Sequence, residues 1–459
     1  MSQHIEVVIE DLAFDGKAVA HLDGKVVFLN GGLPGETVRA EITRSKPRYY
    51  QATVHEILTR SDLRIPARCS HFDYCGGCTW QDLEYQTQLQ FKTTHVRECI
   101  ARIGGLEGVN VHDVIGANEV FRYRNKMEFS FHVMDEKDPD SGEFVPHDFH
   151  LGLHHRGRYD EVFDLEHCHL QSERANDIVN WVRDFVRSNN VPVYNIHTHE
   201  GYMRFLVIRE THFTDQVMVF VVTNFGDMPS QDEFVRGLTE TFPFITTIVH
   251  GQNGKKANVA QPEAEQTLFG PGYIEDELLG LRFRICANSF FQTNPAQAEV
   301  LYRTALEMLE PESSDRLLDL YCGTGAIGLL MASRVGQVYG VELVAEAVQI
   351  AGQNAEINKI DDIRFFEANV KDFLAEMPAD EREFDIIVID PPRAGLHPKA
   401  LKRVIEMRPA KLLYISCNPA TFARDAKTLV AAGYELPEVK PVDMFPHTRH
   451  IELVGLFSV

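Results

Sequence analysis

A glycine-rich turn in the C-terminal third of the chain constrains its fold more than any other feature. A strand-like run, Arg316–Leu320, contains Asp319 and leads into a turn in which Gly323, Gly325 and Gly328 follow the G-x-G-x-x-G pattern. An apolar helical stretch follows directly. Glycines at this spacing let the backbone approach a ligand closely. A strand, such a turn and a helix in this order indicate a parallel α/β sheet that binds an adenosine cofactor.

The next strand strengthens this prediction. Glu342 lies 19 residues after Gly323, at the end of a strand-like run over residues 337–341. An acidic side chain at this place can bind a ribose. NAD and S-adenosylmethionine both fit the pattern up to this point. From about residue 298 onward, helical and strand-like segments alternate, which predicts a parallel sheet with crossover helices.

Two later strand ends carry chemically active groups. One strand-like run ends in D-P-P-R, which begins with Asp390, and the next ends in S-C-N-P, which contains Cys417, 27 residues after Asp390. The ends of strands are where α/β sheets build their sites. Cys417 is then either a nucleophile or one of the inert thiols common in protein cores. Dehydrogenases do not usually continue with these two motifs, whose order is similar to that of Rossmann-like methyltransferases.

A second group of cysteines indicates a metal centre. Cys69, Cys75 and Cys78 are separated by five and two residues, and a Gly-Gly pair frees the backbone around them. A fourth ligand must come from elsewhere. Cys99 lies on the apolar stripe of a predicted helix and favours a core position, whereas Cys168 lies in a polar loop. Four thiolates suit zinc or an iron–sulfur cluster equally. Nearby histidines are alternative zinc ligands: His71, His167 and His169.

The composition opposes a membrane protein and a general nucleic-acid binder. No apolar run reaches the roughly 18 residues of a membrane span, and the N-terminus lacks the regions of a signal peptide. A cytoplasmic protein is expected, with its eight cysteines as thiols or ligands. The net charge of −22 opposes non-specific binding to phosphates. Basic and aromatic clusters over residues 44–50, 122–126 and 154–159 still suit single-stranded RNA, with Arg122 and Lys126 as candidate contacts.

The length of 459 residues predicts about three domains. Residues 1–59 contain short strand-like runs separated by glycine turns, which predicts a five-stranded barrel similar to an OB-fold. Residues 60–285 are predicted to form a mixed α+β region that begins with the cysteine cluster and a helix over residues 83–103. Residues 286–459 carry the glycine turn and both strand-end motifs. They are predicted to form a Rossmann-like α/β catalytic domain.

Taken together, these features resemble the RNA uridine-5-methyltransferase family, and within it the TRAM-domain, iron–sulfur 23S rRNA (uracil-5-)-methyltransferases. The resemblance covers essentially the whole chain. It implies that the barrel is a TRAM domain and that the segment over residues 83–119 packs with the catalytic sheet. The implied ligands of a 4Fe–4S cluster are Cys69, Cys75, Cys78 and Cys168.

The resemblance also assigns residues of the catalytic domain. The C-terminal P-H-T-R-H-I-E stretch matches a family signature in which Glu452 is the implied base, and Cys417 falls on the nucleophile. Position 326 is alanine, where some members carry asparagine. The implied contacts to S-adenosylmethionine are Gln292 (in the F-Q-T-N element), Tyr321, Gly323, Glu342, Asn369 and Asp390.

The implied activity is methylation of carbon 5 of a uridine in 23S rRNA through a covalent cysteine–uracil adduct. Carbon 5 of uracil is a poor nucleophile. A thiolate that adds to carbon 6 produces an enolate whose carbon 5 can attack a sulfonium methyl group, and a carboxylate can then remove the hydrogen on carbon 5. The base must leave its stack, which favours a loop or single-stranded uridine. No obligate protein partner is implied, so a monomer is expected.

Three alternatives compete with this interpretation. The first is a tRNA T-loop uridine; the barrel argues against it because bacterial tRNA-specific enzymes that resemble this chain lack that module, although other relatives have it. The second is an RNA-binding iron–sulfur protein without catalysis, which would not need Cys417 and Glu452 in intact motifs. The third is a radical iron–sulfur methylase, whose usual C-x3-C-x2-C loop differs from the cysteine spacing of this chain.

Overall fold

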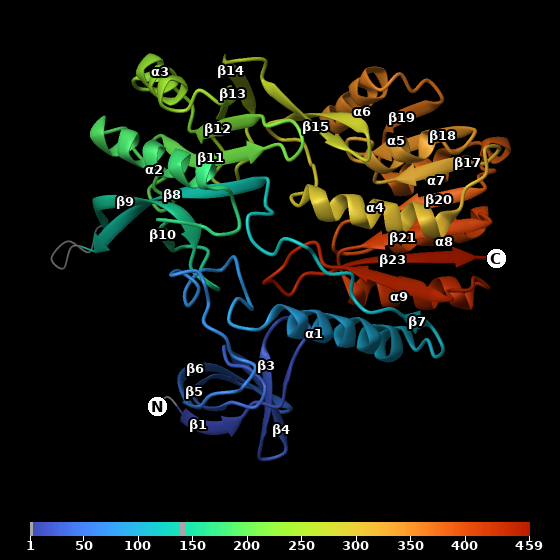
Figure 1. Ribbon diagram of the computed structural model, residues 1–459, viewed down its shortest axis with the longest axis horizontal. Helices are drawn as coiled ribbons and strands as arrows, with labels where there is room; N and C mark the ends of the chain where they lie inside the picture. Colours follow the sequence, from blue (N-terminus) through green and yellow to red (C-terminus); the bar gives the residue numbers. More distant parts are fainter. Residues whose placement is uncertain (1–2, 138–143) are drawn as a thin grey trace.

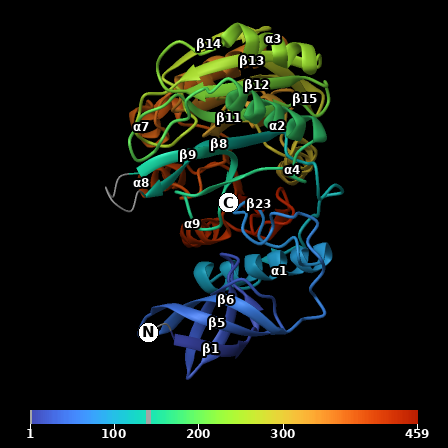
Figure 2. The ribbon, with the colours of Figure 1, turned by 90° about the vertical axis from the view of Figure 1, so that its left-hand side faces the viewer.

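The computed structural model describes residues 3–137 and 144–459, which form a small β-barrel, a central α/β region and a C-terminal α/β sheet (Figure 1). The barrel lies below helix α1 (Tyr85–Glu98), and the other two parts lie above it. Figure 2, turned by 90°, again shows α1 between the barrel and the rest of the molecule. None of the helices in the described part of the chain has the length and apolar character needed to cross a membrane.

The barrel is built from one sheet of six strands in the order β1-β5-β6-β4-β3-β2. Five were expected; the sheet is extended by a two-residue strand at its edge. Strand β1 also contacts β3, so the sheet curls around a core of small and branched side chains. The strands are β1 (Gln3–Val8), β2 (Asp11–Leu12), β3 (Ala18–Leu22), β4 (Lys25–Asn30), β5 (Thr37–Ser45) and β6 (Tyr49–Thr59).

The predicted helix over residues 83–103 is α1 followed by a π-helical segment, η1 (Cys99–Gly104). It ends at Gly105, whose φ of +61° favours glycine. The short strand β7 (Asn110–Val111) then runs parallel to β22 (Glu438–Val442) at the edge of the C-terminal sheet. This segment therefore contributes to the C-terminal sheet, although more than 300 residues separate the two strands in the chain.

The central region is a mixed sheet in the order β10-β9-β8-β11-β12-β13-β14. Every residue of β11 and β12 is buried. The sequence of β12 is almost continuously apolar, whereas β11 also buries the charged residues Arg204, Arg209 and Glu210. A separate hairpin, β15 (Tyr273–Leu278) and β16 (Leu281–Cys286), leads to the C-terminal part. The remaining elements are β8 (Lys126–Lys137), β9 (Phe144–His154), β10 (Val162–Asp164), α2 (Glu173–Ser188), β11 (Met203–Glu210), β12 (Val217–Thr223), α3 (Gln231–Thr241), β13 (Ile245–Gln252) and β14 (Ala264–Phe269).

The C-terminal sheet has the order β19-β18-β17-β20-β21-β23-β22-β7. Strands β17 to β21 are parallel to one another, and β23 inserts antiparallel between β21 and β22. The strand order reverses between β17 and β20, which opens a crevice at their carboxyl ends. The elements are α4 (Pro295–Leu309), β17 (Arg316–Leu320), α5 (Ala326–Ala332), β18 (Gln337–Glu342), α6 (Ala345–Ile357), β19 (Ile363–Glu367), α7 (Val370–Glu376), η2 (Ala379–Glu381), β20 (Ile386–Ile389), α8 (Pro398–Met407), β21 (Lys411–Ser416), α9 (Pro419–Ala431) and β23 (Glu452–Ser458).

Candidate active site

A cavity of about 910 Å³ lies at the carboxyl ends of the C-terminal strands. It brings together all eight residues that the sequence analysis placed in a catalytic or cofactor-binding role. These residues come from the segment before α4, from the ends of β17, β18, β19, β20 and β21, and from β23. They are Gln292, Tyr321, Gly323, Glu342, Asn369, Asp390, Cys417 and Glu452.

The glycine turn and the acidic residue after β18 hold one another in place. The backbone N–H of Gly323 donates to Oε2 of Glu342 over 3.1 Å, and the N–H groups of Leu343 and Val344 donate to Oε1 over 2.7 and 2.9 Å. Tyr321 adopts a φ of +66°, which is strained for a residue with a side chain. The carboxylate is thus fixed at the mouth of the turn, where a ribose hydroxyl could reach it.

Asp319 anchors the helix that follows the turn. Its buried Oδ2 accepts a hydrogen bond of 2.9 Å from the N–H of Gly328, and a Cβ at position 328 would lie 3.1 Å from the same oxygen. The third glycine of the motif therefore permits this close approach. Burial raises the pKa of Asp319 to about 7.

Two amide side chains line other parts of the cavity. Asn369 caps α7, since its Oδ1 accepts from the N–H of Lys371 over 3.2 Å. Its Nδ2 is the group left to contact a ligand. The side chain of Gln292 hydrogen-bonds the buried Tyr302, and the backbone carbonyl of Gln292 accepts from Nδ2 of Asn125 over 3.2 Å.

The antiparallel strand β23 places Glu452 beside Cys417. The paired positions of the two strands end at Ser416 and Leu453. Cys417 follows β21 directly, and Glu452 is the first residue of β23. The two residues therefore lie close together at one end of this strand pair, and the carboxyl group of Glu452 helps to raise the pKa of the Cys417 thiol. The thiol and the carboxyl group therefore share one wall of the cavity, with Asp390 on the neighbouring strand β20.

Burial and neighbouring negative charges keep the Cys417 thiol and the Glu452 carboxyl group protonated when the cavity holds no ligand. Burial, aided by Glu452 and Asp390, raises the pKa of the Cys417 thiol to about 11. Burial and then Asp390 raise the pKa of Glu452 well above its ordinary value. Arg393 opposes both shifts. A bound cation, or removal of water from the cavity, would change this balance.

Arg393 and His450 are site residues to which the sequence analysis gave no role. Arg393 donates from Nη2 to Nδ1 of His450 over 3.3 Å, and both side chains line the cavity. Burial, with Arg393 adding to it, lowers the pKa of His450 to about 4, so its imidazole is neutral near pH 7. Arg393 belongs to the D-P-P-R motif and His450 to the P-H-T-R-H-I-E stretch. Membership of these motifs was the signal in the sequence that could have identified both residues. Tyr302 and Arg124 also line the cavity without having been named as site residues.

The residues predicted to contact RNA differ in how exposed they are to solvent. Residues 43–48 at the turn between β5 and β6 are mostly exposed. Arg122 is half-exposed and pairs with Glu173 over 2.5 Å. Lys126 is half-buried, and burial lowers its pKa to about 8, so it is a poorer phosphate contact than its sequence neighbourhood suggested. Arg124, between them, reaches the active-site cavity instead.

Replacing Asp390 by asparagine is expected to stabilise the ligand-free protein in a pH-dependent way. Burial raises the pKa of Asp390 from 3.8 to about 7. Between these values the unfolded chain is ionised and the folded chain is not, so stability falls as the pH rises through this window. The variant should gain up to about 4 kcal/mol at pH 8 and almost nothing near pH 4. Urea unfolding at both pH values checks this; an equal gain at pH 4 would contradict it.

A second cavity, of about 300 Å³, lies next to the first and contains the cysteine group. Its lining includes Cys69, Cys75, Cys78 and Cys168. Gly76, Gly77 and Arg124 line both cavities and so form the wall between them.

Hydrogen bonds already point at the sulfur atoms of this second cavity. Gln81 donates from Nε2 to Sγ of Cys78 over 3.2 Å, and the N–H of Gly77 donates to Sγ of Cys75 over 3.3 Å. Such donors are typical of sulfur atoms that carry negative charge in a metal centre. Among the described residues, no three His, Cys, Asp or Glu side chains are arranged to hold a single metal ion. Cys99 lies elsewhere, in the apolar core shared by α1 and the C-terminal sheet.

Comparisons with known proteins agree with these observations. The TRAM domain model matches residues 2–54, and the tRNA (Uracil-5-)-methyltransferase model matches residues 247–458. An uncharacterized RNA methyltransferase of Chlorobaculum tepidum is 39% identical and aligns over 99% of this chain and 96% of its own length. Another, from Caldanaerobacter subterraneus, is 36% identical over 99% and 98%. The crystal structure of Pyrococcus abyssi tRNA (uracil-54, C5)-methyltransferase in complex with S-adenosyl-L-homocysteine is similar with a TM-score of 0.77, at 31% identity, over 99% of this chain and 100% of that one.

Proposed function

This chain belongs to the RNA (uracil-5-)-methyltransferase family, and we propose that it methylates carbon 5 of a loop or single-stranded uridine in 23S rRNA. The observation that carries the chemistry is the pairing of β21 with β23, which brings Cys417 and Glu452 together in one cavity. A nucleophile and a base on one wall can act on adjacent ring carbons of a single base. The choice of 23S rRNA is supported by the resemblance of the cysteine set Cys69, Cys75, Cys78 and Cys168 to the cluster ligands of the iron–sulfur 23S rRNA enzymes.

Cys417 and Glu452 divide the reaction between them. The Cys417 thiol first loses its proton to water, an ionisation that the Arg393 cation favours. The thiolate then adds to carbon 6 of the uracil, and the electron pair of the C5=C6 bond moves toward carbon 5 and the carbonyl. S-adenosylmethionine supplies the methyl group that carbon 5 takes up, with S-adenosylhomocysteine as the leaving group. Glu452 then takes the proton from carbon 5, the C5=C6 bond re-forms, and the Cys417 thiolate leaves.

The remaining cavity residues are proposed to hold the methyl donor. Glu342, already fixed by the turn at Gly323, suits the ribose hydroxyls. Asn369 is proposed to contact the adenine, and Gln292 and Asp390 the methionine end. The cationic donor would favour the ionised form of Asp390, which burial alone disfavours.

We also propose that Cys69, Cys75, Cys78 and Cys168 hold a 4Fe–4S cluster. Four thiols surround a cavity of about 300 Å³, and this volume suits an inorganic cluster better than one zinc ion, which would draw its ligands to about 2.3 Å. The sulfur atoms already receive N–H donors. The cluster would fold the loop that walls the active site.

Protein prepared without oxygen is expected to contain about four iron and four sulfide ions per chain. Cys168→Ser should lose most of the iron, and Cys99→Ser should keep it, because Cys99 packs in a separate core. Metal analysis and the visible absorption spectrum measure both. One zinc ion per chain with no sulfide would contradict this assignment.

A tRNA uridine is the second candidate target, and one comparison favours it. The P. abyssi protein named for tRNA uracil-54 matches 99% of this chain over its full length, so the presence of the barrel does not separate the two substrates as the sequence analysis expected. Both RNAs present uridines in loops, and the same chemistry serves either.

Transfer of a labelled methyl group decides between these targets. Undermodified 23S rRNA and tRNA are offered separately to wild-type protein and to Cys417→Ala. Label on rRNA that disappears in the variant supports the proposal, and mapping then locates the uridine. Label on tRNA alone replaces 23S rRNA by tRNA as the target. No label on either RNA, with folded and iron-loaded protein, supports the non-catalytic alternative.

A further inference from the structure

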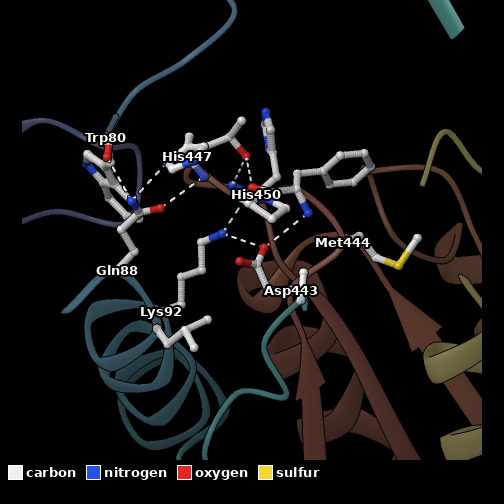
Figure 3. Close-up of polar contacts among 12 residues, drawn as sticks. Trp80, Gln88, Lys92, Asp443, Met444, His447 and His450 are labelled. Carbon is white, nitrogen blue, oxygen red and sulfur yellow. Dashed lines mark hydrogen bonds and ion pairs between the residues drawn. The ribbon is translucent and has the colours of Figure 1, made fainter. Parts of the chain in front are cut away.

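Residues 443–450, in the loop between β22 and β23, are held by side chains and backbone groups from distant parts of the chain. Only Ile451 separates this segment from Glu452, and its residues Phe445, Thr448 and His450 line the active-site cavity. The conformation of this loop therefore sets where the proposed base begins its strand. Figure 3 shows the polar contacts that converge on it from helix α1.

A buried ion pair lies at the start of this loop. Nζ of Lys92, on α1, lies 2.7 Å from Oδ1 of Asp443, and the two side chains are 1% and 0% exposed. Lys92 also donates to the carbonyl of Phe445 over 3.2 Å, and the N–H of Phe445 donates to Oδ1 of Asp443 over 3.0 Å. Oδ2 of Asp443 accepts from the Tyr85 hydroxyl over 2.9 Å. The ion pair thus holds the backbone between residues 443 and 445 in a tight turn, in addition to neutralising two buried charges.

Gln88, one turn before Lys92, holds the middle of the loop. Its Oε1 accepts from the N–H of His447 over 2.9 Å, and its Nε2 lies 3.2 Å from Nδ1 of the same residue. His447 has a φ of +63°, a conformation that a residue with a side chain adopts only when its surroundings impose it. The backbone N–H groups of Thr79 and Trp80, just after Cys78, both donate to the His447 carbonyl, over 2.8 and 3.0 Å.

Helix α4 completes the support from the other side. Gln297 donates to the carbonyl of Asp443 and Asn294 to that of Met444, each over 3.0 Å. A fully buried lysine is rare, and a buried ion pair is weak as a source of stability because both charges lose their water. The arrangement is better explained by what it holds in place.

We propose that Lys92 and Asp443 are positioning residues for the elimination step, which hold the 443–450 loop so that Glu452 faces carbon 5 of the bound uracil. This inference rests on the proposed function of Glu452. Neither residue lines the active-site cavity; each acts through the loop. Adduct formation at Cys417, which lies at the end of β21, should depend on the pair much less.

The test replaces both charges together. Lys92→Met alone would leave a buried, unpaired carboxylate and destabilise the fold, whereas Lys92→Met with Asp443→Asn removes both charges and keeps an acceptor for the Phe445 N–H. The double variant should remain folded and bind S-adenosylhomocysteine like wild type. In single-turnover reactions, the rate of protein–RNA adduct formation should change less than about threefold, while release of methylated RNA slows about 10- to 100-fold.

The readout is the fraction of RNA that stays attached to denatured protein over time. Gln297→Leu, which leaves the ion pair intact, should shift this fraction in the same direction by less. Asp276→Asn serves as the control: it alters another buried carboxylate that ties backbone N–H groups together, those of His212 and Phe213, and should leave the partition unchanged.

Two outcomes would overturn the inference. If adduct and product fall in parallel in the double variant, or if both match wild type, the pair has only a structural role or none. If wild-type protein forms no Cys417-dependent adduct with rRNA or tRNA, the proposed function itself fails, and this inference fails with it. The reaction of the wild-type protein therefore distinguishes failure of this inference from failure of the proposed function.

Discussion

Cys417→Ala is expected to lower the rate of RNA methylation by at least about 10⁴-fold, the order of loss seen when a covalent nucleophile is removed. Without a thiolate to add to carbon 6, carbon 5 of uracil stays too weak a nucleophile to take up a methyl group. The thiol is half-buried and its pKa is raised to about 11, so alanine removes no ionised group from the ligand-free site. The fold should therefore be retained.

Three measurements make this prediction specific. Methyl transfer to RNA should fall to background, the SDS-stable protein–RNA adduct should be absent, and binding of S-adenosylhomocysteine by calorimetry should change by less than about threefold. Cys322→Ala is a matched control, because Cys322 is another buried thiol that lines the same cavity on the glycine turn. It should retain the adduct. Methylation by Cys417→Ala at more than about one per cent of the wild-type rate would rule out the covalent route.

Glu452→Gln is expected to give the opposite pattern: the adduct forms and persists. Removal of a general base costs about 10²- to 10⁴-fold in rate, and here the cost falls on the step after methyl transfer. Carbon 5 then carries both the methyl group and its original hydrogen, and the Cys417–carbon 6 bond cannot break. Turnover should fall by this factor while RNA bound covalently to the protein accumulates.

Glu452→Gln should not lower the stability of the folded protein. Burial and Asp390 raise the pKa of Glu452 well above its ordinary value, so the wild-type side chain is neutral over a pH range in which an unfolded chain is ionised. Stability of the wild type accordingly falls as the pH rises above about 4.5, and glutamine removes this loss. Thermal unfolding at pH 8 should show the variant at least as stable as wild type. Loss of adduct together with loss of turnover would instead assign Glu452 a part in activating Cys417.

The geometry brings the two proposed catalytic groups into one cavity. β23 inserts antiparallel beside β21, so Cys417, the proposed nucleophile just past the end of β21, and Glu452, the proposed base at the start of β23, become neighbours. Arg393 lies with them and opposes the pKa rise of both groups. The cysteine cavity shares Gly76 and Gly77 with this site, so order in that loop affects the wall against which the RNA base would lie.

Local patterns in the sequence predicted much of the site. The Gly323 turn, the acid at Glu342 and the thiol at Cys417 each stand at a strand end, where residue type and spacing along a few positions carry the information. Cys168 was placed with the cysteine group because of its polar surroundings, and Cys99 was favoured for the core because of its helical stripe; the structure places each there.

Other features depended on contacts that spacing does not encode. The barrel sheet has six strands where five were expected, because β2, two residues long, has too few residues to show a period-two pattern. Lys126 was taken for a phosphate contact because of its basic neighbours, yet tertiary packing half-buries it. The barrel was expected to disfavour a tRNA target, and a full-length match to a tRNA methyltransferase removes that argument.

By itself the sequence determined which chemical groups the protein has and on which kind of element each lies, because motifs and hydrophobic periodicity are properties of neighbouring residues. Only the tertiary structure decided which groups meet. Cys417 lies near Glu452 because β23 pairs with β21, and Lys92 meets Asp443 across 351 positions of the chain because α1 packs beneath the C-terminal sheet. Such pairings follow from the burial of whole faces of helices and sheets, which no local pattern contains.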